Sequence, residues 1–525
     1  MDSDRGEALK RRLRNFTRDI TYGHTMLKTL ELDRFALTHV RKAGPGSWLL
    51  RAKPSQAVQE GFGLAPEILF VAVQGTVQAR DLQRAADEVI GSDLRLDSNL
   101  LIVTDDRDKP LQERLDRLPG RGQRVAWVWG DDPGHQWPLL SETLRKKLPT
   151  YDIFAESNPV RGLQHMGRDT EVANLGTRVA RGEAIGVFGL RKMGKTSLVR
   201  AVTDELDPAS GRVHFDADMA PSSACVVWID AESLDRNAKA DDVADELLAA
   251  LRRRMRAANV SFTPPSQQGI SGLKIAAEAL LENGARLCFV IDEYDVLFER
   301  EGGLGPIPEL SRIFRLLRAW AQQSQGFVSL VLIGRDPEHL STPLLDGISN
   351  PLLAWFTPMW LGPLVPPRDT ELLQKLGRRM GLDVGQKTAE LAHQWTGGHP
   401  MLHRQFGSAL REEVLLRITN SSWKMPTDPH CANAVERFRD RANVLMIDRE
   451  IIELLRKRYK SAYELLLDLV QGNPTVAVSR AGGLHTAGAR TLRNFGLLDE
   501  TTLTLPEHLS WYVKTLLPRT ESVAV

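Results

Sequence analysis

Short apolar runs alternate with amphipathic stretches through the central part of this chain. A run of about four to eight apolar residues is typical of a strand buried on both faces, whereas apolar residues at every third or fourth position are typical of a helix that covers a sheet. The alternation predicts a parallel α/β sheet. We expect its strands at residues 184–188, 224–230, 287–291, 328–333 and 355–361, and its helices at residues 195–206, 239–257, 273–282 and 308–323.

A smaller alternation of the same kind fills the first 150 residues. It predicts a separate small α/β domain, which follows an exposed amphipathic helix in the basic stretch from Arg5 to Arg18. The strands are expected at residues 67–73, 99–104 and 124–129, with a further one at 47–51, and the helices at residues 79–90 and 110–118.

The last third of the chain is predicted to be mostly helical. Residues 369–416 carry helical patterns, and so do residues 430–518 until an alternating stretch at 496–505 predicts a hairpin. A hairpin directly after a helix indicates a winged helix, and the turn residues of Asn158–Gly162 indicate a linker. The predicted domains are an N-terminal α/β domain (1–150), an α/β core (158–365), a helical lid (366–425) and a winged helix (430–525).

A glycine-rich segment joins the first strand and the first helix of the central sheet. The segment Gly189-Leu-Arg-Lys-Met-Gly194-Lys195-Thr196 fits G-x-x-x-x-G-K-[ST], the phosphate-binding P-loop. Glycines let the backbone wrap around a phosphate chain, and the start of a helix favours an anion. Lys195 can reach the outer phosphates, Thr196 can bind Mg²⁺, and Ser197 follows in the first helical turn. We therefore predict that the ligand is a nucleotide with Mg²⁺.

Two acidic residues end the strand predicted at 287–291. In P-loop proteins an acid at this position holds Mg²⁺, which is the role expected of Asp292. The adjacent Glu293 can polarise a water molecule as a general base, which favours a hydrolysing ATPase over a nucleotide kinase. By themselves, two acids after an apolar run are equally compatible with an ordinary strand end.

The bulk composition excludes several classes of protein. The 525 residues carry 68 basic and 67 acidic side chains, a net charge of +1, so there is no global basic field that would drive nucleic-acid binding, although a local patch remains possible. The three cysteines lie far apart and mostly in apolar surroundings, which predicts buried thiols in a reducing compartment. No apolar run approaches the roughly 18 residues of a membrane span, and the charged start is unlike a secretory signal. We expect a cytoplasmic protein without a membrane partner.

The motifs together resemble the STAND class of P-loop ATPases, signal-transduction relatives of archaeal ATPases and of the origin-recognition AAA+ proteins. The resemblance covers about residues 158–518 and rests on Asn158-Pro159, on Gly167-Arg168-Asp-Thr-Glu171 and on the P-loop. In that class a Gly-Arg-x-x-Glu element packs near the adenine, which implies ATP as the nucleotide and this position for Arg168. Met166 stands where the family usually has an aromatic or similar apolar residue.

Two further segments extend the resemblance. Arg335 follows the strand at 328–333 and resembles a sensor arginine, which reports the γ-phosphate. The segment Trp395–Pro400 resembles the lid element whose glycine and proline touch the base, which implies contacts from Gly398 and Pro400. The alternative for Arg335 is a surface arginine without a role. The alternative for Trp395–Pro400 is an ordinary helix end followed by a helix that starts with proline.

Several other residues are candidates for contacts with partners. Arginines at three-residue spacing could reach the nucleotide of a neighbouring subunit or simply form a solvated helix face. Two arginines of the third winged-helix segment could contact DNA, although packing on the core is favoured. The residues are Arg312, Arg315 and Arg318 for the first group, and Arg490 and Arg493 for the second.

The N-terminal domain resembles the second half of a restriction-endonuclease-like fold. Val73-Gln74-Gly75 stands where that fold needs Glu-x-Lys, so a partner-binding or sensing module is favoured over a nuclease. The acids Asp105-Asp106 and Asp131-Asp132 at two strand ends could hold a metal, but turns favour aspartate for local reasons.

Three hypotheses about function follow. The leading one is an ATP-driven switch that acts in signalling or bacterial defence, binds ATP and ADP and could assemble into an oligomer. The second is a DNA-binding AAA+-like loader or regulator that uses the winged helix. The third is a nuclease effector regulated by the ATPase. A protein or DNA partner of the winged helix or of the N-terminal domain stays open.

Overall fold

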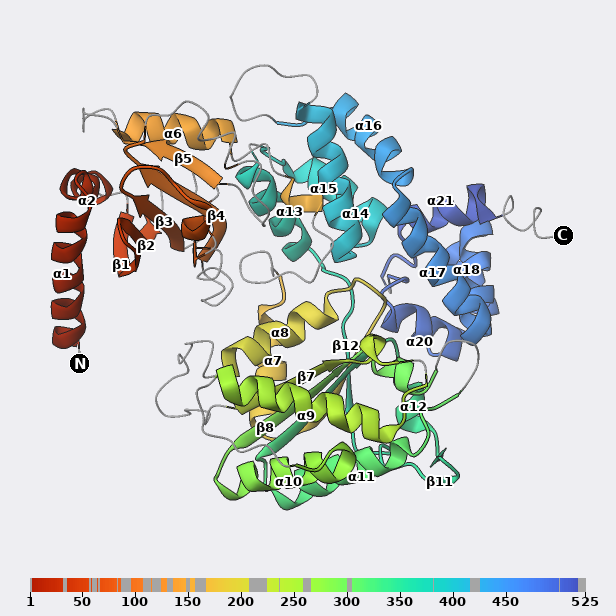
Figure 1. Ribbon diagram of the computed structural model, residues 1–525. Helices are drawn as coiled ribbons and strands as arrows, with labels where there is room; N and C mark the ends of the chain where they lie inside the picture. Colours follow the sequence, from red (N-terminus) through yellow and green to blue (C-terminus); the bar gives the residue numbers. More distant parts are fainter. Residues whose placement is uncertain are drawn as a thin grey trace. The chain divides into compact units, whose positions relative to one another are not determined.

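The computed structural model describes residues 2–31, 35–55, 58, 64, 67–82, 84–85, 96–106, 115, 124–129, 136–147, 152–155, 167–206, 224–235, 237–257, 266–299, 305–380, 382–415, 425–499 and 501–517 (Figure 1). The chain divides into two compact units. One comprises residues 1–166, 366–393 and 403–438, and the other comprises residues 167–365, 394–402 and 439–525.

A five-stranded parallel sheet forms the centre of the second unit (Figure 1). Its spatial order is β12-β6-β9-β8-β7, so the first strand in the chain lies between the fourth and the last. Parallel neighbours cannot be joined by a tight hairpin, so this order requires crossover connections between the strands. The strands are β6 (Ala184–Phe188), β7 (Ala224–Asp230), β8 (Arg286–Asp292), β9 (Val328–Gly334) and β12 (Thr357–Trp360), which confirms all five strand predictions.

Helices cover this sheet and bury its apolar runs. Alternate residues of β8 and β9 enter a core with side chains of α9, α10 and α11, and the residues between them are buried as well. Burial on both sides explains why the strands are continuously apolar. The helices are α7 (Asp169–Ala180), α8 (Lys195–Leu206), α9 (Ala240–Ala257), α10 (Gly269–Glu282) and α11 (Leu310–Gln323). The last four agree with the helices predicted from the sequence, whereas α7 was not predicted.

The same unit ends in a bundle of helices. After the short α12 (Glu338–Ser341) and the hairpin of β10 (Leu344–Leu345) and β11 (Ile348–Ser349), the chain returns to this unit through residues 394–402 and 439–525. The bundle contains α17 (Ala442–Arg458), α18 (Lys460–Gln471), α19 (Pro474–Arg480), α20 (Ala487–Asn494) and α21 (Glu507–Thr515).

The predicted hairpin at 496–505 forms no strand among its described residues. The carboxylate of Asp499 accepts hydrogen bonds from the N–H groups of Thr501 and Thr502 at 2.8 and 2.7 Å, and Leu503 adopts a left-handed φ of 56°. Local hydrogen bonds of this kind compete with a strand ladder. Backbone bonds from the N–H of Asp499 to the carbonyl of Thr504 and from the N–H of Leu503 to the carbonyl of Asp499 close the turn.

The first unit contains a mixed five-stranded sheet in the order β1-β2-β3-β4-β5. The first three strands pair antiparallel and the last two join them in parallel. The strands are β1 (Phe35–Gly44), β2 (Ser47–Pro54), β3 (Glu67–Val73), β4 (Leu96–Thr104) and β5 (Arg124–Val128), and the flanking helices are α1 (Asp2–Asp19), α2 (Gly23–Glu31) and α6 (Gln136–Lys147).

Most of the N-terminal predictions are confirmed, but β1 was not expected. This strand lies at the edge of the sheet and mixes charged and polar residues with apolar ones, so it lacks an apolar run. The linker at Asn158–Gly162, Met166, the pair Asp131-Asp132 and nearly all of the helix predicted at 110–118 lie outside the described residues.

The helices predicted within 369–416 are present as α13 (Arg368–Arg379), α14 (Gln386–Thr396) and α15 (Pro400–Leu415), and α16 (Asp428–Arg439) follows them. In the first unit, a short 3₁₀ turn at Ile153–Ala155 packs against α15. Gly407 leaves room for the ring of Phe154, since a Cβ atom there would lie 2.7 Å from it. The side chain of Arg404 also donates to the carbonyl of Ile153.

Candidate nucleotide-binding site

Close backbone contacts shape the glycine-rich loop between β6 and α8. Gly189 has a φ of 148°, and a Cβ atom there would lie 2.6 Å from the carbonyl oxygen of Leu361. Its N–H donates to the carbonyl of Arg335 at 3.1 Å, and Gly194 also has a positive φ, of 94°. Only glycine adopts such a conformation without strain. Gly189 therefore holds the start of the loop against the ends of β9 and β12, and Gly194 allows the turn that leads into α8.

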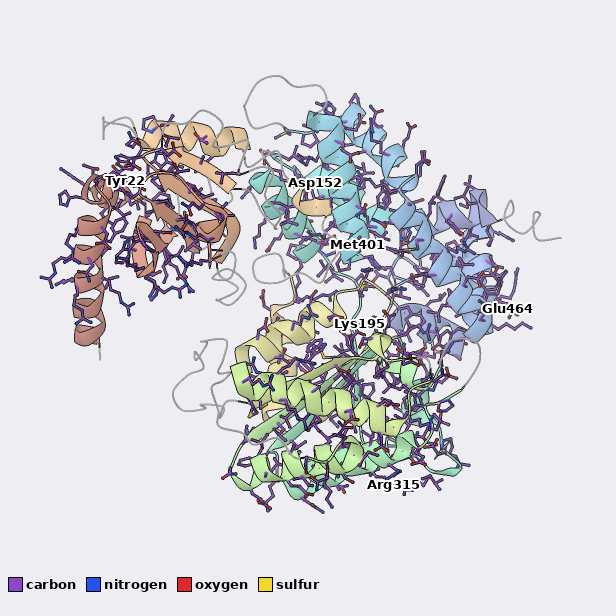
Figure 2. The ribbon with its side chains drawn as sticks, in the orientation of Figure 1. Tyr22, Asp152, Lys195, Arg315, Met401 and Glu464 are labelled. Atoms are coloured by element: carbon purple, nitrogen blue, oxygen red, sulfur yellow. The ribbon has the colours of Figure 1, made fainter. Side chains whose placement is uncertain are left out.

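Lys195 lies in the first turn of α8 (Figure 2) and is only 7% exposed. Its ammonium group donates to the carbonyl oxygens of Gly189 and Leu190, both at 2.9 Å. Burial lowers the pKa of Lys195, and nearby carboxylates, Glu293 foremost, oppose that shift. A buried cation held only by neutral carbonyls gains more from a phosphate oxygen than an exposed one does. The residue therefore fits the predicted role of binding phosphate.

Thr196 and Asp292 meet at the carboxyl edge of the sheet. The hydroxyl group of Thr196 donates to a carboxylate oxygen of Asp292 at 3.3 Å. Burial, and then the charge of Glu293, raise the pKa of Asp292 to about 6. A hydroxyl and a carboxylate are hard oxygen ligands of the kind that Mg²⁺ prefers. The pair therefore fits the predicted metal position.

A metal at this position would need further ligands from the nucleotide and from water. Within the described ranges, no group of three or more histidine, cysteine, aspartate or glutamate side chains could hold a metal ion. Mg²⁺ is usually bound by one or two carboxylates together with substrate phosphates, so a sparse protein shell suits it.

Glu293 follows Asp292 in a strained conformation. Its φ is 49°, in the left-handed region, and its N–H donates to the Asp292 carboxylate at 3.1 Å. Residues other than glycine adopt this conformation at a cost of about 1–3 kcal/mol and are enriched at functional sites. The turn places Glu293 beside the predicted metal position, where a general base is needed.

Two more acids lie at this edge, and the sequence analysis did not select them. Asp230 ends β7 directly opposite Asp292 on β8. Glu232 follows it, and burial, with a further contribution from Glu293, raises its pKa. A signal was present, because the run that forms β7 ends in acids as β8 does. These carboxylates make the edge more negative and therefore more attractive to a divalent cation.

Arg335 contributes its backbone to the P-loop, while its side chain joins a carboxylate network. Its guanidinium group is 3.2 Å from Glu299 and 3.6 Å from Asp336, and its N–H donates to Asp295 at 2.8 Å. Glu299 also contacts His339 at 2.6 Å and forms an ion pair with Arg458 of α17. The predicted sensor is thus connected to the C-terminal helices through one carboxylate, a link that no local sequence pattern shows.

Arg168 is almost completely buried and joins two distant segments. Its guanidinium group donates to the carbonyl oxygen of Gly362 at 2.5 Å and lies 3.3 Å from Glu171. The Gly-Arg-x-x-Glu element is therefore fastened to the chain that follows β12. Its predicted place near the adenine stays a prediction.

The predicted lid element contacts the core through its backbone. Gly398 has a φ of 73°, and a Cβ atom there would lie 1.9 Å from the carbonyl of Leu364. The N–H of Leu364 donates to the carbonyl of Gly398 at 2.9 Å. Pro400 is the first residue of α15, where its missing N–H costs nothing. The geometry explains why glycine occupies position 398.

His399, between these residues, reaches the P-loop itself. The Nε2 atom of its ring lies 3.1 Å from the carbonyl oxygen of Arg191. Burial lowers the pKa of His399 to about 3, so the ring is neutral and Nε2 carries the proton that it donates. His399 lies within the predicted lid element, but no local sequence pattern predicts its contact with Arg191.

Three of the remaining candidate arginines, Arg312, Arg318 and Arg490, have partners in their own unit. Arg312 pairs with Glu309 at the start of α11, and Arg318 donates to the carbonyl of Pro351 at 2.6 Å. Arg315 lies on α11, away from Lys195 in Figure 2. Arg490 donates to the carbonyl of His485 at 3.1 Å. Their proposed contacts with a second subunit or with DNA stay predictions.

The acid considered for a nuclease in the first unit is engaged in hydrogen bonds. Asp105 accepts from the N–H of Gly75 at 2.6 Å and from the side-chain amide of Gln74. Gln74 also accepts from the N–H of Thr21 at 2.7 Å. Gln74 and Asp105 therefore have a structural role, because they connect the turn after α1 with the ends of β3 and β4.

Several solved structures resemble the chain. A Walker-type ATPase of Pyrococcus abyssi matches 69% of this chain and 99% of its own, at 16% identity and a TM-score of 0.47. The Cdc6 protein of Pyrobaculum aerophilum matches 70% and 97%, at 15% identity and a TM-score of 0.34. The ORC2 protein of Aeropyrum pernix matches 70% and 98%, at 14% identity and a TM-score of 0.39.

No protein-family model matches the sequence, and a search of curated proteins finds no match. In the parts of the chain that the structure describes, no helix has the length and apolar character needed to cross a bilayer.

Proposed function

We propose that this chain binds and hydrolyses ATP and acts as a switch of the STAND type. The observation that carries the proposal is the contact of 3.3 Å between Thr196 and Asp292, next to the buried Lys195. A glycine-shaped loop, a buried cation and a hydroxyl–carboxylate pair at one sheet edge are the parts that phosphoryl transfer needs.

Each residue has a proposed role in the reaction. Lys195 binds the outer phosphates, and Thr196 and Asp292 hold Mg²⁺, which neutralises charge on the phosphates when bound. Glu293 accepts the proton of the attacking water. Arg168, Gly398 and Pro400 are proposed to lie near the base, with residues 366–425 as a lid.

Nucleotide state is proposed to reach the C-terminal helices, which we interpret as a winged-helix unit, through Arg335. A γ-phosphate would compete with Glu299 for this guanidinium group, and Glu299 is also bound by Arg458 of α17. A second link runs from Arg191 of the P-loop to Glu450 of α17 at 3.2 Å. A change in these contacts would loosen α17 from the core.

The energy scale sets a limit on this coupling. Moving a two-state equilibrium from mostly closed to mostly open takes about 5.5 kcal/mol of differential binding. Exposed or half-exposed ion pairs contribute only about 0–1 kcal/mol each. The switch therefore needs direct nucleotide contacts, and self-assembly in the ATP state would add to them.

The proposed function is tested by measuring particle mass together with phosphate release. The chain should hydrolyse Mg-ATP, and a slowly hydrolysed ATP analogue should favour a state that differs in mass or shape from the ADP state. Hydrolysis without any such difference would support an ATPase but contradict the switch, and a chain that takes up no nucleotide would contradict both.

A further inference from the structure

We infer that the N-terminal unit binds the phosphate backbone of double-stranded nucleic acid along α1 and the adjoining Lys42 of the edge strand β1. Residues 2–55, which include all of α1 and the hairpin, carry twelve basic and six acidic side chains, a net charge of +6 in a chain whose net charge is +1. The near-neutral total therefore conceals a local positive region. This inference is independent of the proposed ATPase function.

The charges of α1 lie on one side of an amphipathic helix. Leu9, Leu13, Phe16 and Ile20 pack toward the sheet in one hydrophobic core, where Phe16 and Ile20 are fully buried. The opposite side exposes the basic residues Lys10, Arg11, Arg12, Arg14 and Arg18. At 1.5 Å per residue, these cations extend over about 12 Å of helix.

Most of these cations form no ion pair with a side chain that the structure describes, although Glu7 lies one turn before Lys10 and Arg11 in the sequence. Among the residues that the structure places, Lys10, Arg11, Arg12 and Arg14 have no acidic partner. Other helices pair such charges one turn apart: Lys274 with Glu278 on α10, Lys375 with Glu371 on α13, and Lys457 with Glu453 on α17. A row of unbalanced like charges repels itself, so it favours an external polyanion.

The edge of the sheet continues the positive region. Residues 35–55 contain four basic side chains and no acidic one, and β1 is the edge strand. Asp19 at the end of α1 lies 2.5 Å from Lys42 of β1 and 3.8 Å from Arg18. Asp19 thus joins the basic end of the helix to Lys42, which pairs with Trp48 on the face of the sheet that α1 covers. Arg41, Arg51 and Lys53 alternate onto the opposite face, so Lys42 is the hairpin cation that extends the positive surface of α1.

The structure favours double-stranded nucleic acid over two other polyanions. An amphipathic helix binds a membrane by burying its apolar face in lipid, but here that face is already buried in the protein core. Proteins that bind single strands offer exposed aromatic rings for base stacking. The aromatic residues next to these cations, Phe16 and Trp48, are 0% and 3% exposed and pack against each other. Duplex phosphates need only point charges.

The test is fluorescence anisotropy of the full-length chain with a labelled 30-base-pair DNA of arbitrary sequence over a salt series. Wild type should bind with an affinity that falls steeply as salt rises. The double variant Arg11→Gln, Arg14→Gln should lower the slope of log affinity against log salt by about 2, and should weaken binding about 60-fold at 0.1 M salt. Restoring charge with lysine at both positions should restore binding.

The matched control is Arg312→Gln, Arg315→Gln, which removes two exposed charges at the same spacing from α11. It should bind DNA like wild type. Equal losses in both double variants would show a net-charge effect and overturn the inference. Three other outcomes would also overturn the inference. These are no binding of duplex, tighter binding to single strands, and binding to anionic phosphatidylserine vesicles instead of duplex. Equal binding of duplex RNA would support it, because the backbone is the shared ligand.

Discussion

Arg458, the last residue of α17, forms an ion pair with Glu299, the same carboxylate that lies 3.2 Å from Arg335. Glu299 comes shortly after the acids that end β8, and Arg335 follows β9, so both lie close to the predicted nucleotide site. The three side chains join the end of the sheet to a helix more than 100 residues further along the chain. A change at the nucleotide phosphates can therefore act on α17 through the contacts of Arg335, Glu299 and Arg458.

This relationship gives the first prediction, which concerns Arg335. Arg335→Ala should weaken the preference for ATP over ADP more than it weakens the binding of either, because its proposed partner is present only in ATP. Isothermal titration with ADP and with a slow ATP analogue measures the two affinities. The matched control is Arg456→Ala, two residues before the end of α17 and paired with Glu453. An unchanged affinity ratio in Arg335→Ala would contradict the sensor role.

Arg458→Ala tests the same route from the other end. Removing this arginine should free Glu299 to hold Arg335 alone and should shift the ATP/ADP preference toward ADP by a few-fold, with a stability loss of about 1 kcal/mol since the pair is partly exposed. Combining it with Glu299→Ala in a double-mutant cycle isolates the coupling. Strictly additive effects on the affinity ratio would show that α17 does not communicate with Arg335.

Glu293→Gln should separate binding from hydrolysis. Glutamine keeps the size of the side chain but cannot accept the proton of the attacking water, so turnover should fall by about 10²–10⁴-fold, while the affinity for ATP stays within a few-fold of wild type. Phosphate release and nucleotide titration give the two quantities. The control is Glu232→Gln, at the same edge but after β7. Normal turnover in Glu293→Gln would mean that another group is the base.

Asp292 should make the stability of the metal-free chain depend on pH. Its pKa is raised to about 6, against about 3.9 in an unfolded chain, so the folded state binds the proton more tightly. This contribution to stability is fully present below about pH 4 and is lost as the pH rises through about 6. Asp292→Asn cannot ionise and should therefore be more stable than wild type at pH 7.5 without metal, by at most about 3 kcal/mol.

Urea unfolding at pH 7.5 and pH 4 checks this prediction. The difference between Asp292→Asn and wild type should be present at the higher pH and should shrink at the lower one. Mg²⁺ with nucleotide should stabilise wild type but not the variant, since a neutral amide is a poorer ligand for the metal. A stability difference that is the same at both pH values would contradict the raised pKa.

The sequence predicted the central sheet well because its signals are local. A strand buried on both faces must be apolar throughout, and the P-loop must lie between such a strand and a helix, so β6 and α8 are recognised together. Asp292 was selected because the same pattern ends in an acid. These site residues can be recognised from a few neighbours in the sequence, because binding phosphate and Mg²⁺ requires these residue types.

The features that sequence reasoning missed depend on distant or competing contacts. The pairing of Arg458 with Glu299, and the contact of His399 with Arg191, join segments far apart in the chain. The turn at Asp499 forms because one side chain captures two N–H groups that a strand ladder would have used. The net charge of +1 does not show the basic excess of α1, because a total averages over a local patch, which the composition left possible.

The most direct measurement is the thermal stabilisation by Mg-ATP of wild type and of Lys195→Ala, with Lys274→Ala as a surface control. A site filled about 1,000-fold above its Kd stabilises a protein by about 4.1 kcal/mol. Wild type and Lys274→Ala should show a rise in melting temperature that corresponds to this stabilisation. Lys195→Ala should still melt cooperatively but should show no rise. An equal shift in Lys195→Ala, or no shift in wild type, would contradict the nucleotide site on which the account rests.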